Sequence, residues 1–370
     1  MSLAIYRKYR PVVFEDLVGQ DLIVRILKGE ASQDRISHAY LFAGPRGTGK
    51  TTASRLIAKA ANCETRAKDA KFHKLGEPCN KCRSCEEIDS NHSLDVIEID
   101  AASNRGIDEI RNLKETVRTP PSSSKFKVFI IDEAHQLTKD AANALLKTLE
   151  EPPEYAIFIL ATTEVEKIPA TIASRTQRFQ FKHIPVKLII QKLTNIAKLE
   201  KISATAEVLE LVAASASGSL RDAESLLNQI IILGGDKNIS VEEVENMVGK
   251  TSFRKVASFA ELLLASKREE SLKALNDIAE HGYSLSFFVK DLLEHLRRVM
   301  VLKFNPHMGA VLESQISSEH VALIAEASKK FETKHIKLVK ELINCYGQMR
   351  YSQFPQLLIE VAIADGLETK

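Results

Sequence analysis

The chain has 370 residues, of which 44% are hydrophobic, and its formal net charge is +2. This length predicts two or three domains, and the apolar content is sufficient for packed cores, which excludes a wholly disordered chain. No apolar stretch is long enough for a membrane span, and residues 1–11 lack the apolar core of a signal peptide, so we expect a cytoplasmic protein. The small net charge predicts no general affinity for nucleic acid, so DNA binding would need a local basic face.

In chain order, residues 12–181 alternate short apolar runs with segments of helical periodicity. The apolar runs predict five strands, at 38–43, 94–99, 126–131, 156–161 and 177–181. The periodic segments predict helices at 50–61, 107–118 and 138–150. This alternation is typical of an α/β fold in which helices cover both faces of a parallel sheet.

A glycine-rich loop follows the first expected strand and leads into the first of these helices. Its members are Gly44, Pro45, Arg46, Gly47, Thr48, Gly49, Lys50, Thr51 and Thr52. Glycines let backbone N–H groups curl around phosphates, and the helix N-terminus adds partial positive charge. In such a loop Lys50 reaches the β- and γ-phosphates, and Thr51 ligates magnesium. A glycine-rich turn with an accidental lysine is the alternative, and the flanking strand and helix favour a nucleoside triphosphate site.

Acidic residues follow the third expected strand. The apolar run Val128–Ile131 suits a strand buried on both faces, and it ends in Asp132 and Glu133. Ligands bind at the carboxyl ends of strands in open α/β sheets. Asp132 would hold magnesium, and Glu133 would orient or deprotonate the water that attacks the γ-phosphate. The alternative is a strand that ends in solvated acids, and the glycine loop favours the catalytic interpretation.

Four of the five cysteines lie in residues 62–90, at Cys63, Cys79, Cys82 and Cys85. The Cys-x2-Cys-x2-Cys spacing lets thiolates converge on one ion, and four thiolates form a closed structural zinc site. A reducing cytosol disfavours disulfides. An iron–sulfur cluster or free thiols remain alternatives, although the final cysteine and proline of a ferredoxin run are missing. Cys345, in an apolar helical segment, is predicted to be a small buried hydrophobe.

Beyond Pro185 the strand pattern stops. Residues 186–247 have helical spacing in four short pieces, and longer amphipathic segments are expected near 253–280, 284–303, 316–330 and 335–365. The sequence thus predicts three domains: an α/β nucleotide-binding domain at 1–181 with a cysteine insertion at 62–90, a small helical lid at 182–248, and a larger helical domain at 249–370.

Further motifs surround these sites in a recognisable order. They are Asp16-Leu17-Val18-Gly19-Gln20, the run Leu-Leu-Lys-Thr-Leu-Glu-Glu-Pro-Pro at 145–153, Thr162-Thr163, Ser174-Arg175 and Gly218-Ser219-Leu220-Arg221. With the glycine loop, this set resembles the AAA+ ATPases, and more narrowly the gamma/tau subunits of the bacterial DNA polymerase III clamp loader. The similarity covers essentially the whole chain. The run at 145–153 and the four-cysteine insertion are its most specific parts.

The resemblance implies roles for individual residues. Thr162 would be a sensor of the γ-phosphate or the attacking water, and Arg221 a lid sensor that contacts ATP bound to its own subunit. Arg175 would be an arginine finger that enters the ATP site of a neighbouring subunit, so hydrolysis would depend on assembly. Without the resemblance, each of the three has a simpler interpretation: a strand residue, a helix residue and a surface charge. The resemblance also implies an adenine pocket lined by Arg10, Pro11 and Val18.

DNA contacts are implied for the helix at 107–118 and the loop before it. The candidates are Arg105 and Arg111, because tracking a phosphate backbone needs cations and helix N-termini rather than base-specific groups. For each arginine a solvated helix face is the alternative.

The function implied is that of an ATPase motor subunit, with ATP, Mg²⁺ and Zn²⁺ as cofactors, that loads the sliding clamp onto primed DNA within the DNA polymerase III holoenzyme. Its partners would be the other subunits of a pentameric hetero-oligomer, the clamp and primed DNA. The C-terminal helical domain would form the oligomerising collar, and no polymerase site is expected. One alternative is another AAA+ motor that remodels DNA, such as a branch-migration helicase, which would need strands in a C-terminal winged helix. The other is a clamp-loader scaffold that does not hydrolyse ATP, which predicts losses among Lys50, Thr51, Asp132 and Glu133.

Overall fold

The structure is a computed structural model, and it describes residues 4–103, 113, 115–234, 240–249, 251–309, 312, 316 and 318–367. The chain forms two compact units. The first comprises Met1–Ile184 and Gly218–Ser225, and the second comprises Pro185–Ser217 and Leu226–Lys370.

A five-stranded parallel sheet forms the centre of the first unit. Its strands are β1 (Ala39–Ala43), β2 (Val96–Asp100), β3 (Lys127–Asp132), β4 (Ala156–Thr162) and β5 (Gln177–Gln180), and their order in the sheet is β2-β3-β4-β1-β5. The parallel sheet predicted from the sequence is confirmed, and its strands match the predicted segments to within two residues. Because β4 lies between β1 and β3, the glycine loop after β1 and the acids after β3 meet at one edge of the sheet.

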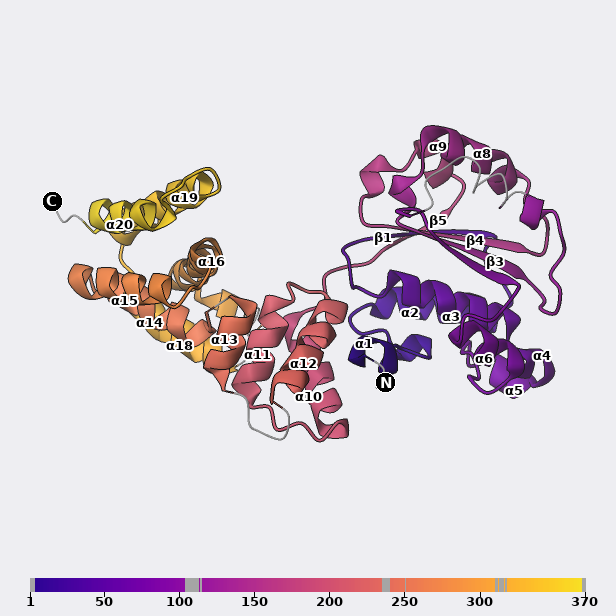
Figure 1. Cartoon of the computed structure of the whole chain (residues 1–370), viewed down its shortest axis with the longest axis horizontal. Coiled ribbons are helices and arrows are strands. Elements are labelled where there is room, and N and C mark those ends of the chain that lie inside the picture. Colours follow the sequence, from indigo (N-terminus) through magenta and orange to yellow (C-terminus); the bar gives the residue numbers. More distant parts are fainter. Residues whose placement is uncertain are drawn as a thin grey trace. The chain divides into compact units, whose positions relative to one another are not determined.

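Helices cover both faces of this sheet (Figure 1). On one face lie α2 (Asp21–Ser32) and α3 (Lys50–Asn62), and on the other lie α8 (Lys139–Glu150) and α9 (Ala170–Ala173). Strand residues alternate between the two cores, as the pleat requires: Tyr40 and Phe42 face α2 and α3, while Leu41 faces α8. Short 3-10 turns, η2 (Ala134–Gln136) and η3 (Val165–Lys167), follow β3 and β4.

Two further segments pack beside α2 and α3. The N-terminal segment contains α1 (Ile5–Lys8) and the 3-10 turn η1 (Phe14–Asp16). The cysteine insertion folds into α4 (Glu64–Lys68), α5 (Ala70–His73) and α6 (Arg83–Asp89), a group of short helices next to α3 in Figure 1.

Helices joined by turns and loops form the described residues of the second unit. Its helices are α10 (Val186–Leu199), α11 (Ala206–Ser215), α12 (Leu220–Gly234, whose residues up to Ser225 belong to the first unit), α13 (Val241–Val248), α14 (Phe253–Leu264), α15 (Arg268–Glu280), α16 (Leu285–Phe304), the 3-10 turn η4 (Pro306–Met308), α18 (Ser318–Lys330), α19 (His335–Met349) and α20 (Pro355–Gly366). Within the described segments, none of these helices has the length and apolarity of a membrane span.

Two segments that the periodicity joined are each divided into two helices. Between α14 and α15, Ser266 adopts a left-handed conformation (φ 56°), which no helix can continue. Between α19 and α20 the break precedes Pro355, which occupies the first turn of α20, where its missing N–H costs no helical hydrogen bond. The helical spacing of apolar residues continues across both breaks, so this spacing did not reveal where one helix ends and the next begins.

Candidate nucleotide and metal sites

A pocket of about 320 Å³ lies where β1 and β3 end and α3 begins. The glycine loop from Arg46 to Thr52 forms one wall, and Asp132 and Glu133 lie at another. The remaining lining residues come from the N-terminal segment, the end of β2 and the loop after it, the segment after β5, and the start of α12: Tyr6, Arg10, Pro11, Leu17, Val18, Asp100, Ala102, Ile184, Leu220, Arg221 and Glu224. The structure thus brings together the predicted loop, acids, sensor arginine and N-terminal residues.

Lys50 is almost completely buried in this pocket, with 6% of its surface exposed. Its ammonium donates hydrogen bonds to the carbonyls of Gly44 (2.7 Å) and Pro45 (2.8 Å). Burial lowers the pKa of Lys50, while Glu133 and Asp132 oppose that shift. The backbone carbonyls of Gly44 and Pro45 therefore hold the Lys50 ammonium, which gives the loop a positive charge.

The loop is closed by the beginning of α12. The Leu220 N–H donates to the Gly47 carbonyl at 3.1 Å, and a side chain at Gly47 would collide with Ser219. Gly47 also has a φ of +72°, a conformation that strains other residues. Glycine is therefore required here for two independent reasons, and the helix that carries Arg221 is joined directly to the loop.

The magnesium pair predicted from the sequence is in contact. The Thr51 hydroxyl donates to Asp132 Oδ2 at 2.7 Å, and Asp132 Oδ1 accepts the N–H of Glu133 at 2.9 Å. A hydroxyl and a carboxylate at the mouth of a phosphate loop are oxygen donors that suit Mg²⁺. The donor set therefore fits the ion, which Thr51 and Asp132 would hold.

Glu133 follows β3 in a left-handed conformation (φ 48°), and its carboxylate accepts a hydrogen bond from the Thr163 hydroxyl at 3.2 Å. Thr162, which we predicted to be the sensor, is fully buried. Its hydroxyl lies 3.0 Å from His135 Nδ1 and accepts the Glu164 N–H at 3.0 Å. Thr162 thus faces His135, whose Nδ1 lies 3.5 Å from the Glu133 carboxylate, and its role as a sensor stays a prediction. The neighbouring Thr163 contacts Glu133 directly.

Arg221 lies with Tyr6, its guanidinium carbon 5.2 Å from the centre of the Tyr6 ring. Arg10 is a further cation here, and its pKa is lowered by burial and by the nearby Arg55. Arg10, Arg46 and Arg221 line this pocket, and three arginines around one pocket favour a polyanionic ligand. Tyr6 was missed in the sequence analysis, because it stands on a four-residue helix without a motif.

Arg175 lies outside the nucleotide pocket, after α9. Its guanidinium makes an ion pair with Glu150 (2.5 Å) and donates to the Thr171 carbonyl (2.7 Å), while 34% of the side chain remains exposed. The arginine is therefore held by residues of its own chain but stays accessible from outside. The DNA candidates Arg105 and Arg111 lie outside the described residues.

The four clustered cysteines form one site. Ligand atoms of Cys63, Cys79, Cys82 and Cys85 all lie within 4.8 Å of one another, and none is in a disulfide. The sulfur atoms of Cys79 and Cys85 are 4.0 Å apart, close to the ~3.8 Å that tetrahedral coordination by zinc–sulfur bonds requires. The contact with Cys85 lowers the pKa of Cys63, which favours a thiolate at that position. The residues fit a structural zinc ion.

Removing one of these ligands should remove the metal. We expect Cys85→Ser, at a site with no exposed surface, to reduce zinc from about one ion per chain to almost none. Metal analysis of the purified chain measures this. Cys345→Ser, which changes the buried cysteine of α19, is the matched control and should keep its zinc. Full zinc content in Cys85→Ser would contradict the assignment.

Three protein-family models match consecutive parts of the chain between residues 19 and 363. Residues 19–185 match the family model described as DNA polymerase III, delta subunit. Residues 188–236 match the DNA polymerase III clamp loader subunit, ATPase lid domain, and residues 239–363 match DNA polymerase III subunits gamma and tau domain III.

Individual proteins similar to this chain are named as the tau or gamma/tau subunit of DNA polymerase III. The chain is 40% identical over 367 residues to DNA polymerase III subunit tau of Bacillus subtilis, which covers 99% of this chain and 63% of that protein. The chain belongs to the DNA polymerase III gamma/tau family. Other members include the gamma/tau subunit of Mycoplasma pneumoniae (44% identity; 79% of this chain, 42% of that one) and subunit tau of Escherichia coli (40% identity; 81% and 45%). The chain thus spans 42–63% of the length of these family members.

Similar solved structures have lower sequence identity to the chain than these family members have. The Bacillus subtilis clamp loader delta protein is 15% identical with a TM-score of 0.40, and covers 93% of this chain and 99% of its own. The Thermotoga maritima RuvB branch migration motor is 16% identical with a TM-score of 0.46, and covers 69% and 79%.

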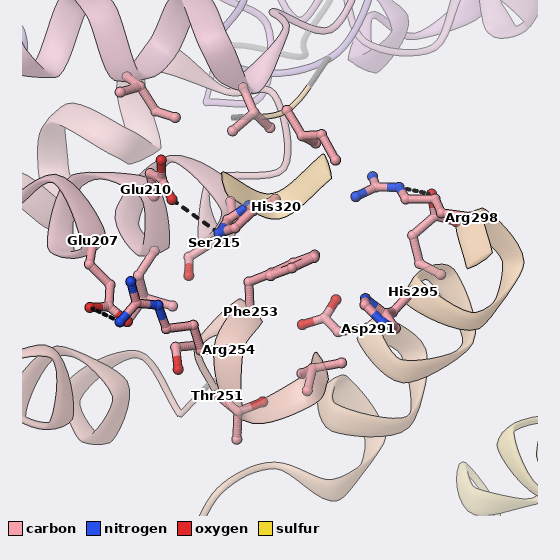
Figure 2. A pocket seen from close by; sticks show the side chains of 18 residues that line it. Glu207, Glu210, Ser215, Thr251, Phe253, Arg254, Asp291, His295, Arg298 and His320 are labelled. Carbon is pink, nitrogen blue, oxygen red and sulfur yellow. Dashed lines mark hydrogen bonds and ion pairs between the residues drawn. The ribbon is translucent and has the colours of Figure 1, made fainter. Parts of the chain in front are cut away.

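A second pocket, of about 220 Å³, lies within the helical unit (Figure 2). Its polar lining is already extensively paired: His320 bonds to Glu210 at 3.1 Å and stacks on Phe253, with 3.8 Å between ring centres. His295 differs, because it is 2% exposed and neither ring nitrogen has a hydrogen-bond partner among the described residues. Burial, with Arg298 and His320 nearby, lowers its pKa to about 4.

This buried imidazole makes stability depend on pH. Below pH 6.5 the unfolded chain binds a proton at His295 that the folded chain does not, so stability falls as pH drops from about 6.5 to about 4. From pH 7 to pH 5, this one group should cost roughly 2 kcal/mol. His320, whose pKa is also lowered to about 4, adds to the slope.

Urea unfolding followed by circular dichroism at the two pH values measures the effect. We expect His295→Leu to lose less stability between pH 7 and pH 5 than the unchanged chain. His307→Leu, at an exposed position in η4, is the control and should keep the original slope. An unchanged slope in His295→Leu would contradict the expectation.

Proposed function

We propose that this chain is an ATP-hydrolysing motor subunit of a bacterial clamp loader, which loads the ring-shaped sliding clamp onto primed DNA. One observation carries the proposal. In a chain of the gamma/tau family, the Thr51–Asp132 hydrogen bond, the buried Lys50 and the adjacent Glu133 converge on one pocket. Phosphoryl transfer needs this combination of a phosphate cradle, a carboxylate that holds metal and an acid that positions water.

The residues would divide the work as follows. Lys50 and the loop N–H groups bind the β- and γ-phosphates, and Thr51 and Asp132 hold Mg²⁺, which neutralises charge on the phosphates when bound. Glu133 orients the attacking water, and the Thr163 hydroxyl fixes the direction of its carboxylate. Arg10, Pro11, Val18 and Tyr6 lie where the base and sugar would bind.

Arg175 and Arg221 would link this chemistry to assembly. Arg221, beside the loop that holds the phosphates, reports on nucleotide bound to its own subunit. Arg175, partly exposed and outside that pocket, would reach the ATP of a neighbouring subunit after leaving Glu150. The partners we propose are the other subunits of a pentameric loader, the clamp and primed DNA, in the cytoplasm, with no polymerase site on this chain. We also propose that the chain divides into a nucleotide-binding domain, a lid and a collar, with boundaries at residues 181 and 248.

The rival functions fit the molecule less well. A scaffold that does not hydrolyse ATP predicts losses at the catalytic positions, and Lys50, Thr51, Asp132 and Glu133 are all present. A branch-migration motor predicts strands after residue 250, and the described residues of that region contain helices and turns only.

ATP turnover tests the proposal. The purified chain should hydrolyse ATP slowly alone, and at least about tenfold faster when partner subunits, clamp and primed DNA are all present, because the arginine finger acts only in the assembly. Omitting the clamp is the control, and should remove most of the stimulation. A rate that is indifferent to all three additions would overturn the proposal.

A further inference from the structure

The cysteine insertion reaches toward the nucleotide pocket through one buried carboxylate. Glu77 is 8% exposed, and its two oxygens accept the backbone N–H groups of Phe14 (2.7 Å) and Glu15 (3.2 Å). Lys28 lies 3.2 Å from the same carboxylate and offsets its charge. Glu77 therefore binds a backbone segment that lies 63 residues earlier in the chain.

The bonded N–H groups are the ones that the turn η1 leaves without partners. The first N–H groups of a helical turn have no acceptor inside it, and the residue before the turn usually supplies one. Here that residue is Val13, which has no side-chain acceptor. Glu77 takes the place of the missing cap, so η1 depends on the insertion for its start.

This turn leads directly into the wall of the nucleotide pocket. Phe14 is fully buried in the core with α3, and Leu17 and Val18 line the pocket. Leu17 lies against the glycine loop, with its Cδ2 at 3.2 Å from where a side chain on Gly49 would begin. A shift of η1 would therefore move the residues that face the base.

Glu77 is itself held in place by its neighbours. It lies on an irregular segment between α5 and Cys79, so no helix or strand fixes it. Gly76, before it, packs so closely against the Lys28 carbonyl that no side chain would fit, and Cys79, two residues later, belongs to the four-cysteine cluster. The cluster and the Gly76 contact fix the two ends of the segment that carries Glu77.

We infer that Glu77 is a positioning residue for the nucleotide pocket, and that it transmits the order imposed by a metal ion in the cysteine cluster to the base-binding wall. The inference rests on the proposed nucleotide site. It gives the metal a defined consequence: its loss weakens nucleotide binding through Glu77 and η1. The insertion keeps other anchors, because Lys59 pairs with Asp89 (2.6 Å) and Arg66 donates to the Ala60 carbonyl, so removing Glu77 alone leaves it docked.

Titration of the full-length chain with Mg²⁺–ADP tests the inference. We expect Glu77→Ala to raise the Kd about fivefold to tenfold, the size of a lost charge-assisted cap, while zinc content stays at the unchanged chain's value. Glu77→Gln keeps one acceptor oxygen and should give a smaller increase. Glu86→Ala, at an exposed position on α6 of the same insertion, is the matched control and should bind as the unchanged chain does.

Removing zinc with a chelator completes the experiment. The Kd of the unchanged chain should rise to the level of Glu77→Ala, and chelation should add little in Glu77→Ala, because both changes act on one connection. An unchanged Kd in both Glu77 variants, or equal effects of chelation in every variant, would overturn the inference. If Glu77→Ala unfolds, Glu77→Gln with an unchanged melting temperature decides between these outcomes. A chain that binds no nucleotide before any substitution would instead overturn the proposed function.

Discussion

Glu133→Gln should reduce ATP turnover of the assembled loader by about a hundredfold or more, while the chain still binds ATP. The carboxylate of Glu133 lies at the pocket and accepts a hydrogen bond from the Thr163 hydroxyl. Among the described residues, no hydrogen bond joins this carboxylate to the loop that carries Lys50. The substitution keeps the shape of the side chain and removes only its ability to orient and accept a proton from water. Single-turnover kinetics and a nucleotide titration separate the two effects.

Glu164→Gln is a suitable control for Glu133→Gln. Glu164 is another acid near His135, with its carboxylate 3.2 Å from Nε2, but it is not among the residues that line the pocket. It should leave turnover within about threefold of the unchanged chain, the scale of small surface effects. Equal losses in the two variants would show that Glu133 has no special role.

Arg175→Ala should reduce turnover of the assembled loader by about a thousandfold, the effect of losing a cation supplied across an interface. Turnover by the isolated chain should hardly change, since the guanidinium binds Glu150 and Thr171 rather than the chain's own pocket. Steady-state ATPase assays of the isolated chain and of the complete assembly measure the difference.

Glu150→Gln is the informative companion to Arg175→Ala. It removes the ion pair that holds Arg175 within its own chain but keeps the guanidinium available. Turnover in the assembly should stay near that of the unchanged chain. If Glu150→Gln were as damaging as Arg175→Ala, the ion pair itself, and not contact with a neighbour, would explain the loss.

Features that are determined by short motifs and by the spacing of residues along the chain could be predicted from the sequence. The parallel sheet followed from apolar runs at regular intervals, and the glycine loop and Asp132 followed from motifs at strand ends. The triplet of cysteines in the cluster was predicted from its spacing, and Cys63, sixteen residues before Cys79, lies with the triplet in the structure.

Features that depend on which way a side chain points could not be predicted. Thr162 ends β4 and Thr163 follows the strand, and their hydroxyls have different partners, His135 and Glu133. The sequence does not show which of the two hydroxyls contacts Glu133, so the contact of Thr163 was not predicted. The same limit applies to Glu77, whose partner turn lies far away in the chain, and to Tyr6.

Each ATP site is proposed to be completed by a residue of a neighbouring subunit, and mixing two inactive variants tests this most directly. Assemblies built only with Glu133→Gln chains, or only with Arg175→Ala chains, should be almost inactive. In a mixed assembly some interfaces join the intact Glu133 of one chain to the intact Arg175 of the next, so turnover should return to a substantial fraction of the unchanged value. A mixture as inactive as its components would contradict the account.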